Sequence, residues 1–186
     1  MGDRWSFPKQ ASAATYVWQP MIVSGTNLSM PHYQDAWQVN LITGVVSSTN
    51  IGNRIIPGSD TSQIQYNGDW RKDTLSVLSS DKKDASFTVR FKGKQVGIYG
   101  LSRPDGGYAR ITIQNSKGKI VLSSIIDLYC KYPVSGLKFL SPVLPTGQYT
   151  FFLSVMGERG NWSDKRKSIY GSSGCFVSLD KLVIRD

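Results

Sequence analysis

Short stretches of alternating polar and apolar residues, each ended by a turn signal, constrain the fold of this chain more than any other feature. Residues 63–66 and 87–91 are examples, with β-branched or aromatic side chains at every second position. A period of two is the pattern of a strand that buries one face. No segment of useful length shows the period of a helix. The sequence therefore predicts an all-β protein.

Turn signals recur at intervals typical of a β-sandwich. Glycine-containing turns are predicted at 92–94, 115–118 and 144–147. About eight strands are expected from residue 63 onward, the further ones at 95–99, 108–114, 119–126, 137–140, 149–155 and 175–184. This pattern predicts an antiparallel β-sandwich of jelly-roll type over residues 63–186.

The first 43 residues differ from the rest of the chain, being aromatic and repeatedly broken by turns. They predict two or three short strands, too few to bury a core alone. We therefore expect residues 1–43 to form an appendage that packs on the sandwich. Residues 44–62 are rich in Ser, Thr, Asn, Gly and Pro and are interpreted as a connector.

The chain is basic, with 22 Lys and Arg against 13 Asp and Glu and a formal charge of +9. That charge suits acidic partners, whether uronic or sulfated sugars, an anionic surface or nucleic acid. The cations are scattered in pairs, with one denser run at 165–167. Because no long basic stripe is present, nucleic acid is not the expected partner.

The expected location is extracellular or periplasmic, as for a secreted parent protein. No stretch of about 18 apolar residues could span a membrane. The polar start at 1–4 does not match a secretion signal, so we expect an exported parent to have lost its signal here.

Catalytic constellations are hard to assemble from these residues. His32 is the one histidine, and Glu158, the one glutamate, is followed by a cation that favours the ionised state, the wrong state for a general acid. Cys130 and Cys175 permit one disulfide and no four-ligand zinc site. No cluster of Asp and Glu has the density of a calcium loop, so no cofactor is expected, and a structural calcium is the one metal left open. The chain is predicted not to be an enzyme.

Sugar binding is better supported, because five Trp and nine Tyr exceed the needs of a core of this size. The loop at 157–171 is long and polar, with an aromatic residue on each side of its basic run, and long loops are often functional. Trp162 and Tyr170 either stack on a ligand or pack on the end of the sandwich. Arg159 and Asn161 are the polar candidates beside them.

A second candidate loop runs from 101 to 108. Here Arg103 and Asp105 either form a hydrogen-bonding fork beside Tyr108 or simply close a tight turn with an ion pair. The same choice between binding and packing applies to a further set of aromatic residues, of which Trp70 is interpreted as packing: Tyr66, Trp70, Tyr129 and Tyr132.

From residue 64 to the C-terminus the chain resembles the galactose-binding-like β-sandwich modules attached to many bacterial glycoside hydrolases and esterases. The resemblance rests on segments that follow one another in the order of that family: 64–70, 87–100, 104–107, 127–129, 144–150 and 174–180. The turn at 115–119 departs from the family pattern, and the loop around Trp162 is more basic. The resemblance implies a carbohydrate-binding β-sandwich.

Residues 1–5, 14–20 and 33–37 resemble the closing segment of the five-bladed propeller in family 43 glycoside hydrolases, especially galactan-degrading members. This resemblance implies a polysaccharide target of galactan type and a catalytic glycoside hydrolase domain as partner. None of that family's catalytic carboxylates maps onto a residue of this chain.

Three hypotheses follow from the sequence. The first is a non-catalytic carbohydrate-binding module that tethers a polysaccharide-degrading enzyme to a galactose-containing or acidic glycan. The second is a structural β-sandwich that docks on a catalytic propeller without binding sugar. The third, a truncated but active glycosidase, requires two carboxylates that flank a common pocket.

Overall fold

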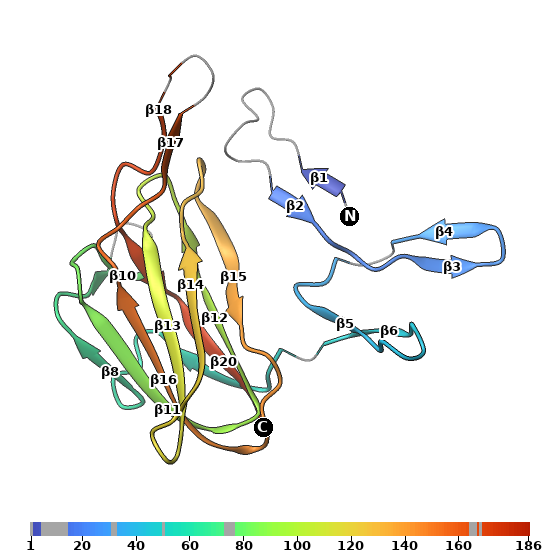
Figure 1. Ribbon diagram of the computed structural model, residues 1–186, viewed down its shortest axis with the longest axis horizontal. Helices are drawn as coiled ribbons and strands as arrows, with labels where there is room; N and C mark the ends of the chain where they lie inside the picture. The colour runs from blue at the N-terminus through green and yellow to red at the C-terminus, as the bar shows by residue number, and fades with distance from the viewer. Residues whose placement is uncertain are drawn as a thin grey trace. The chain divides into compact units, whose positions relative to one another are not determined.

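The protein is built of antiparallel β-strands arranged in two compact units, Met1–Asn50 and Ile51–Asp186 (Figure 1). The structure is a computed structural model that describes residues 2–4, 15–30, 33–49, 51–72, 77–163, 167 and 169–186. No helix occurs among the described residues, and the prediction of an all-β chain is confirmed.

The second unit is a β-sandwich of two main sheets, as predicted. The larger sheet has the order β14-β13-β16-β11-β8, and the smaller has the order β15-β12-β20-β7. Every pair of neighbouring strands in both sheets is antiparallel. The strands are β7 (Arg54–Pro57), β8 (Ile64–Asn67), β11 (Ser86–Gly93), β12 (Gln95–Ser102), β13 (Tyr108–Asn115), β14 (Ile120–Asp127), β15 (Val134–Leu140), β16 (Gly147–Val155) and β20 (Lys181–Arg185).

Smaller sheets complete the described strands. Three strands form a sheet of order β19-β10-β9, and the remaining strands form two-stranded hairpins. Their bounds are β1 (Gly2–Arg4), β2 (Thr15–Val17), β3 (Ile22–Ser24), β4 (Asn27–Ser29), β5 (Trp37–Val39), β6 (Val46–Ser48), β9 (Arg71–Lys72), β10 (Leu78–Ser80), β17 (Asn161–Ser163), β18 (Ile169–Gly171) and β19 (Val177–Leu179).

The structure differs from the predicted connector at residues 44–62. Strand β6 lies in this range, and so does β7, which pairs with β20 at the edge of the smaller sheet. Ile56 of β7 is buried in the sandwich core. Its burial holds this segment against the sheet as a strand, although the surrounding composition suggested a loop. Pro57 ends β7 at a sheet edge, a position where a missing N–H costs little.

The predicted strand at 175–184 is divided in two by Asp180. Strand β19 pairs with β10, whereas β20 pairs with β12 and β7. Both strands are largely apolar and buried. The sequence therefore gives no sign that the chain passes from one sheet to another at Asp180.

The core lies between the two main sheets and follows the alternation of the strands. On β11, Phe87 and Val89 are buried while Arg90 is exposed. On β16, Phe151 and Leu153 are buried while the residue between them is half-buried. One face of each strand therefore enters the core, and the other is free to carry polar groups.

Aromatic rings form a cluster in the core next to β8. Phe87 lies 5.7 Å from Trp70 and 5.9 Å from Phe151, measured between ring centroids. Tyr66 also contacts this cluster and donates a hydrogen bond from its hydroxyl to the carbonyl of Gly58 at 2.5 Å. Burial raises the pKa of the Tyr66 hydroxyl above its ordinary value. Tyr66 and Trp70 therefore pack with the core, as interpreted for Trp70.

In the first unit, side chains fix the backbone between its hairpins. The Gln19 amide donates to the Gln34 carbonyl and accepts from the Gln34 N–H, at 2.9 and 2.8 Å. The Trp37 indole N–H donates to the carbonyl of Trp18 at 2.9 Å. That this segment packs on the sandwich stays a prediction.

Candidate functional site

The two candidate loops, which the sequence suggested separately, are joined at one end of the sandwich. Gly106 forms an isolated bridge with Phe176, and the Gly107 N–H donates to the Phe176 carbonyl at 2.9 Å. The Phe176 N–H in turn donates to the Asp105 carbonyl at 2.9 Å. The Tyr108 N–H donates to the Glu158 carbonyl at the same distance. Residues 103–108, 158–163 and 169–176 thus form one hydrogen-bonded surface, the loop end.

Arg103 and Asp105 form a bidentate ion pair inside this surface. The Arg103 Nε and Nη2 atoms donate to the two carboxylate oxygens, and the Nη2–Oδ2 distance is 2.9 Å. The guanidinium also lies 4.7 Å from the ring centroid of Phe176. This is the tight turn with an ion pair that the sequence left open, and its guanidinium also contacts the segment that follows the second loop. A direct role of either residue in binding sugar stays a prediction.

Tyr108, Arg159 and Asn161 belong to the same end. Tyr108 is half-buried at the start of β13, and Arg159 and Asn161 are exposed. Between the last two, Gly160 is buried and accepts a hydrogen bond from the Ser172 N–H at 2.9 Å. The backbone that carries Arg159 and Asn161 is therefore anchored to the neighbouring loop.

Trp162 and Tyr170 lie opposite each other in the β17–β18 hairpin, whose register pairs Asn161 with Gly171 and Trp162 with Tyr170. The predicted loop at 157–171 thus contains a short antiparallel ribbon. The side chains of Trp162 and Tyr170 lie outside the described residues, as do Lys165, Arg166 and His32.

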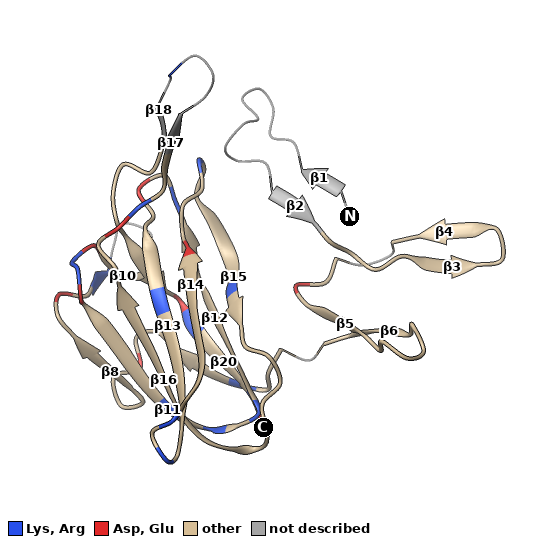
Figure 2. Cartoon of the chain, viewed as in Figure 1, with Lys and Arg blue, Asp and Glu red and all other residues tan. Residues whose placement is uncertain are grey.

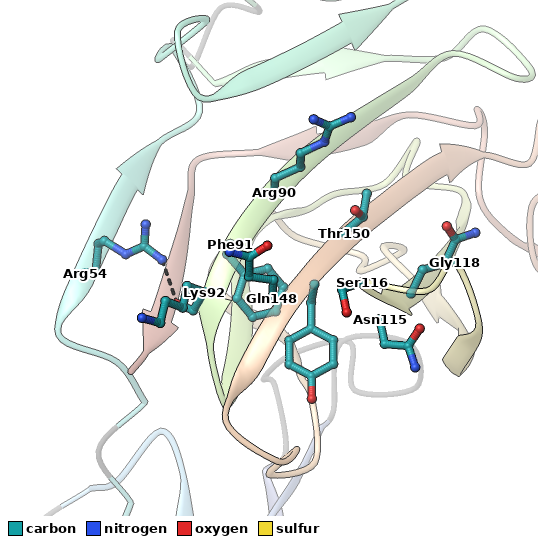
Figure 3. A pocket seen from close by; sticks show the side chains of 11 residues that line it. Arg54, Arg90, Phe91, Lys92, Asn115, Ser116, Gly118, Gln148 and Thr150 are labelled. Carbon is teal, nitrogen blue, oxygen red and sulfur yellow. Dashed lines mark hydrogen bonds between the residues drawn. The ribbon is translucent and has the colours of Figure 1, made fainter.

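A second surface, which the sequence analysis did not identify, is a hollow lined by residues of β7, β11, β13 and β16 and of the turn after β13 (Figure 3). Its volume is about 540 Å³. Figure 3 shows Arg90 and Thr150 on neighbouring strands, Asn115 and Ser116 on the other side, and Arg54 at the rim. The lining residues are Arg54, Arg90, Phe91, Lys92, Gln114, Asn115, Ser116, Gly118, Gln148, Tyr149 and Thr150. We refer to it as the outer hollow.

The signal for the outer hollow was present in the strand pattern. Alternation puts Arg90 and Lys92 on the face of β11 opposite Phe87, and puts Gln148 and Thr150 on the face of β16 opposite Phe151. The missing information was the pairing of these strands, which brings the outward residues together.

Charges of both signs are spread over the described part of the sandwich (Figure 2). No Asp or Glu lines the outer hollow. Among the described residues no three His, Cys, Asp or Glu gather in a group that could hold a metal ion. Cys130 is buried, Cys175 is partly exposed, and both thiols are free.

No helix long and apolar enough to cross a membrane occurs in the described part of the chain.

Comparison with protein-family models and with curated proteins finds no match. Among solved structures, the chain is similar to an exo-β-1,3-galactanase from Phanerochaete chrysosporium, solved with galactose, at 18% identity and a TM-score of 0.45. That match covers 98% of this chain and 40% of the galactanase.

Two further solved structures are each similar to 69% of this chain. A family two carbohydrate esterase from Cellvibrio japonicus is 16% identical with a TM-score of 0.42, covering 69% of this chain and 32% of the esterase. The CBM36-1 domain of a multidomain xylanase from the hindgut metagenome of Trinervitermes trinervoides is 12% identical with a TM-score of 0.41. The latter match covers 69% of this chain and 93% of that domain. The chain thus spans less than half of the two enzymes.

Proposed function

We propose that this chain is a non-catalytic carbohydrate-binding module of a polysaccharide-degrading system. The observation that carries the proposal is the loop end, where two polar loops are hydrogen-bonded into one surface below a hairpin that pairs Trp162 with Tyr170. Sugar recognition uses flat rings against the apolar face of a pyranose and planar polar groups for its hydroxyls. The loop end contains both kinds of residue.

The hydrogen bonds that hold the loops in place support a binding role for the loop end. Binding residues are commonly carried by loops that a rigid scaffold holds in place. Here the scaffold is the sandwich. The Tyr108–Glu158 hydrogen bond joins the two loops, and the Gly106–Phe176 bridge holds the first loop against the segment that follows the second. The backbone register of the β17–β18 hairpin places Trp162 opposite Tyr170.

The ligand that we propose for the loop end is a galactose-containing glycan, and the partner is a catalytic glycoside hydrolase domain. Both follow from the resemblances in the sequence. The module then acts by tethering, which raises the local concentration of enzyme on its polysaccharide without new chemistry. We propose an extracellular or periplasmic setting for the parent protein.

Replacing Trp162 by alanine is expected to weaken binding to galactan at least about tenfold, because a stacked aromatic ring is the kind of residue that dominates a binding site. Affinity electrophoresis against galactan, arabinogalactan, pectin, xylan and heparin, with salt titrated, measures this. The matched control is Tyr99→Ala, which removes a half-buried ring from β12, away from the loop end. Thermal unfolding of each variant reports that the sandwich remains folded.

Retardation by neutral galactan that survives salt, disappears in Trp162→Ala and persists in Tyr99→Ala supports the proposal. Retardation only by acidic polymers, fading as salt rises, reduces the interaction to charge attraction. Lack of retardation by every neutral polymer contradicts a galactan-binding module.

A second candidate function is a structural domain that docks on a catalytic propeller. The observation that favours it is the apolar surface of the first unit, where Leu41 and Ile42 have relative exposures of 93% and 96%. Exposed apolar patches of this kind mark interaction sites. The other exposed apolar residues of this unit include Trp18, Met21, Ile22, Val23, Leu28, Met30, Tyr33 and Val45.

The double substitution Leu41→Ser and Ile42→Ser is expected to lower the fluorescence of the dye ANS severalfold, because ANS binds exposed apolar surface. The unfolding temperature of the sandwich is expected to stay the same, because both residues lie in the first unit. If docking is the function, gel filtration with a separately produced galactanase propeller yields a complex that the double variant fails to form. Unchanged ANS fluorescence contradicts an accessible apolar patch.

A further inference from the structure

The lining of the outer hollow includes residues at the end of β11 and in the β13–β14 turn. Both lie at the end of the sandwich opposite the β17–β18 hairpin (Figure 1). The outward residues of the hollow form a grid. Gln114, Thr150 and Arg90 are register partners across β13, β16 and β11, and Lys92 and Gln148 are partners in the next row. With strands about 4.8 Å apart and rows about 6.7 Å apart, the grid measures about 10 by 7 Å. These dimensions suit one or two sugar rings.

The charge of this grid is positive and uncompensated within it. Arg90 and Lys92 are exposed, and neither side chain makes an ion pair or a hydrogen bond with any described residue. Arg54 at the rim donates from Nη2 to the Lys92 carbonyl at 3.0 Å, and its Nε lies 3.9 Å from an Asp186 carboxylate oxygen. Arg90 and Lys92 are therefore the cations available to a ligand.

Neutral donors surround these cations. The side chains of Gln114, Gln148 and Thr150 make no hydrogen bond with a described residue. The Asn115 side-chain oxygen accepts the N–H groups of Lys117 and Lys119 at 3.0 and 3.1 Å, which fixes the amide within the β13–β14 turn. Amide and hydroxyl groups can hydrogen-bond to the hydroxyls of a sugar, while a neighbouring cation pairs with an acidic substituent on that sugar.

Two core residues also line the hollow and hold its strands in place. Phe91 and Tyr149 are buried, with stacked rings whose centroids are 5.6 Å apart. The Tyr149 hydroxyl donates to the Pro145 carbonyl at 2.6 Å, so this ring is fixed. Rigid strands that carry the unpaired polar groups lower the ordering cost of binding.

We propose that the outer hollow is a second carbohydrate site, which binds a sugar residue carrying a carboxylate or sulfate group, with Arg90 as the residue that pairs with the anion. A guanidinium matches the two oxygens of such a group with two parallel hydrogen bonds. Lys92 adds charge, and Gln114, Gln148 and Thr150 contact the ring hydroxyls. The site is independent of the loop end and of the proposed galactan binding there.

Isothermal titration of the full chain with trigalacturonate, with a sulfated κ-carrageenan tetrasaccharide and with neutral galactotriose tests this proposal. Arg90→Gln is expected to raise the Kd for the acidic ligand at least about tenfold, because one charge-assisted bidentate contact is lost. The two acidic ligands distinguish a carboxylate from a sulfate as the recognised group.

Arg110→Gln is the matched control. Arg110 is exposed on the same face of β13 as Gln114, about 13 Å away along the strand, and the substitution removes the same charge. We expect it to change the Kd less than about twofold. Trp162→Ala is expected to leave the affinity for the acidic ligand unchanged, which separates this site from the loop end.

Equal weakening by Arg90→Gln and Arg110→Gln overturns the proposal, because it indicates a diffuse basic surface. Tight binding of a 20-base-pair DNA that both variants weaken equally leads to the same conclusion. Loss of the acidic ligand in Trp162→Ala, with none in Arg90→Gln, assigns the binding to the loop end and also overturns the proposal.

Discussion

Replacing Phe87 by alanine is expected to lower the free energy of unfolding by about 3–5 kcal/mol. Phe87 is fully buried on β11 and contacts the rings of Tyr66, Trp70 and Phe151. Its removal costs the transfer free energy of the ring and leaves a cavity that three large neighbours cannot fill without moving. Since a domain of this kind is stable by about 5–15 kcal/mol, the loss is a large part of the total.

Urea denaturation followed by tryptophan fluorescence measures this effect, because Trp70 lies 5.7 Å from Phe87 and reports on the same cluster. Phe87→Leu fills most of the space and is expected to cost less than half as much. Ile125→Ala, at an exposed position of β14, is expected to change stability by less than about 1 kcal/mol. A loss below about 1 kcal/mol in Phe87→Ala, with an unchanged urea slope, contradicts this packing.

The regular strands could be predicted because the sequence of a single strand already shows which of its residues are buried. In β11 and β16 the buried residues alternate with outward ones, and this period is visible without knowing the partner strand. Strand β7 was missed because a single buried residue, Ile56, does not make a pattern. The division at Asp180 was missed because the apolar run continues on both sides of it.

The candidate sites could not be predicted in the same way, because their residues come from different strands and loops. The link between Gly106 and Phe176 joins segments far apart in the sequence, and neither segment indicates the other. The same is true of Arg90, Thr150 and Gln114, which become neighbours only through the pairing of three strands. Residue types therefore indicated the chemistry of binding, whereas strand topology decides which residues share a surface.

Gly106→Ala is expected to destabilise the chain by about 2–4 kcal/mol and to weaken binding at the loop end. A Cβ atom at this position meets the Leu128 carbonyl oxygen at 1.9 Å and the Leu128 carbonyl carbon at 2.4 Å. Both atoms belong to the backbone, so no side-chain rotation relieves the contact and the loop has to move. Movement of Gly106 breaks its bridge with Phe176, which holds residues 103–108 against the C-terminal part of the loop end.

Gly147→Ala is the matched control, because the nearest atom to its added Cβ is a Tyr149 ring carbon at an ordinary 3.5 Å. We expect a change below about 1 kcal/mol there. Urea denaturation of both variants, with titrations against galactan and trigalacturonate, measures stability and the two sites together. Loss of galactan binding with retained trigalacturonate binding in folded Gly106→Ala indicates that the loop end depends on the Gly106 bridge while the outer hollow does not. Unchanged stability in Gly106→Ala contradicts the close approach of Gly106 to Leu128.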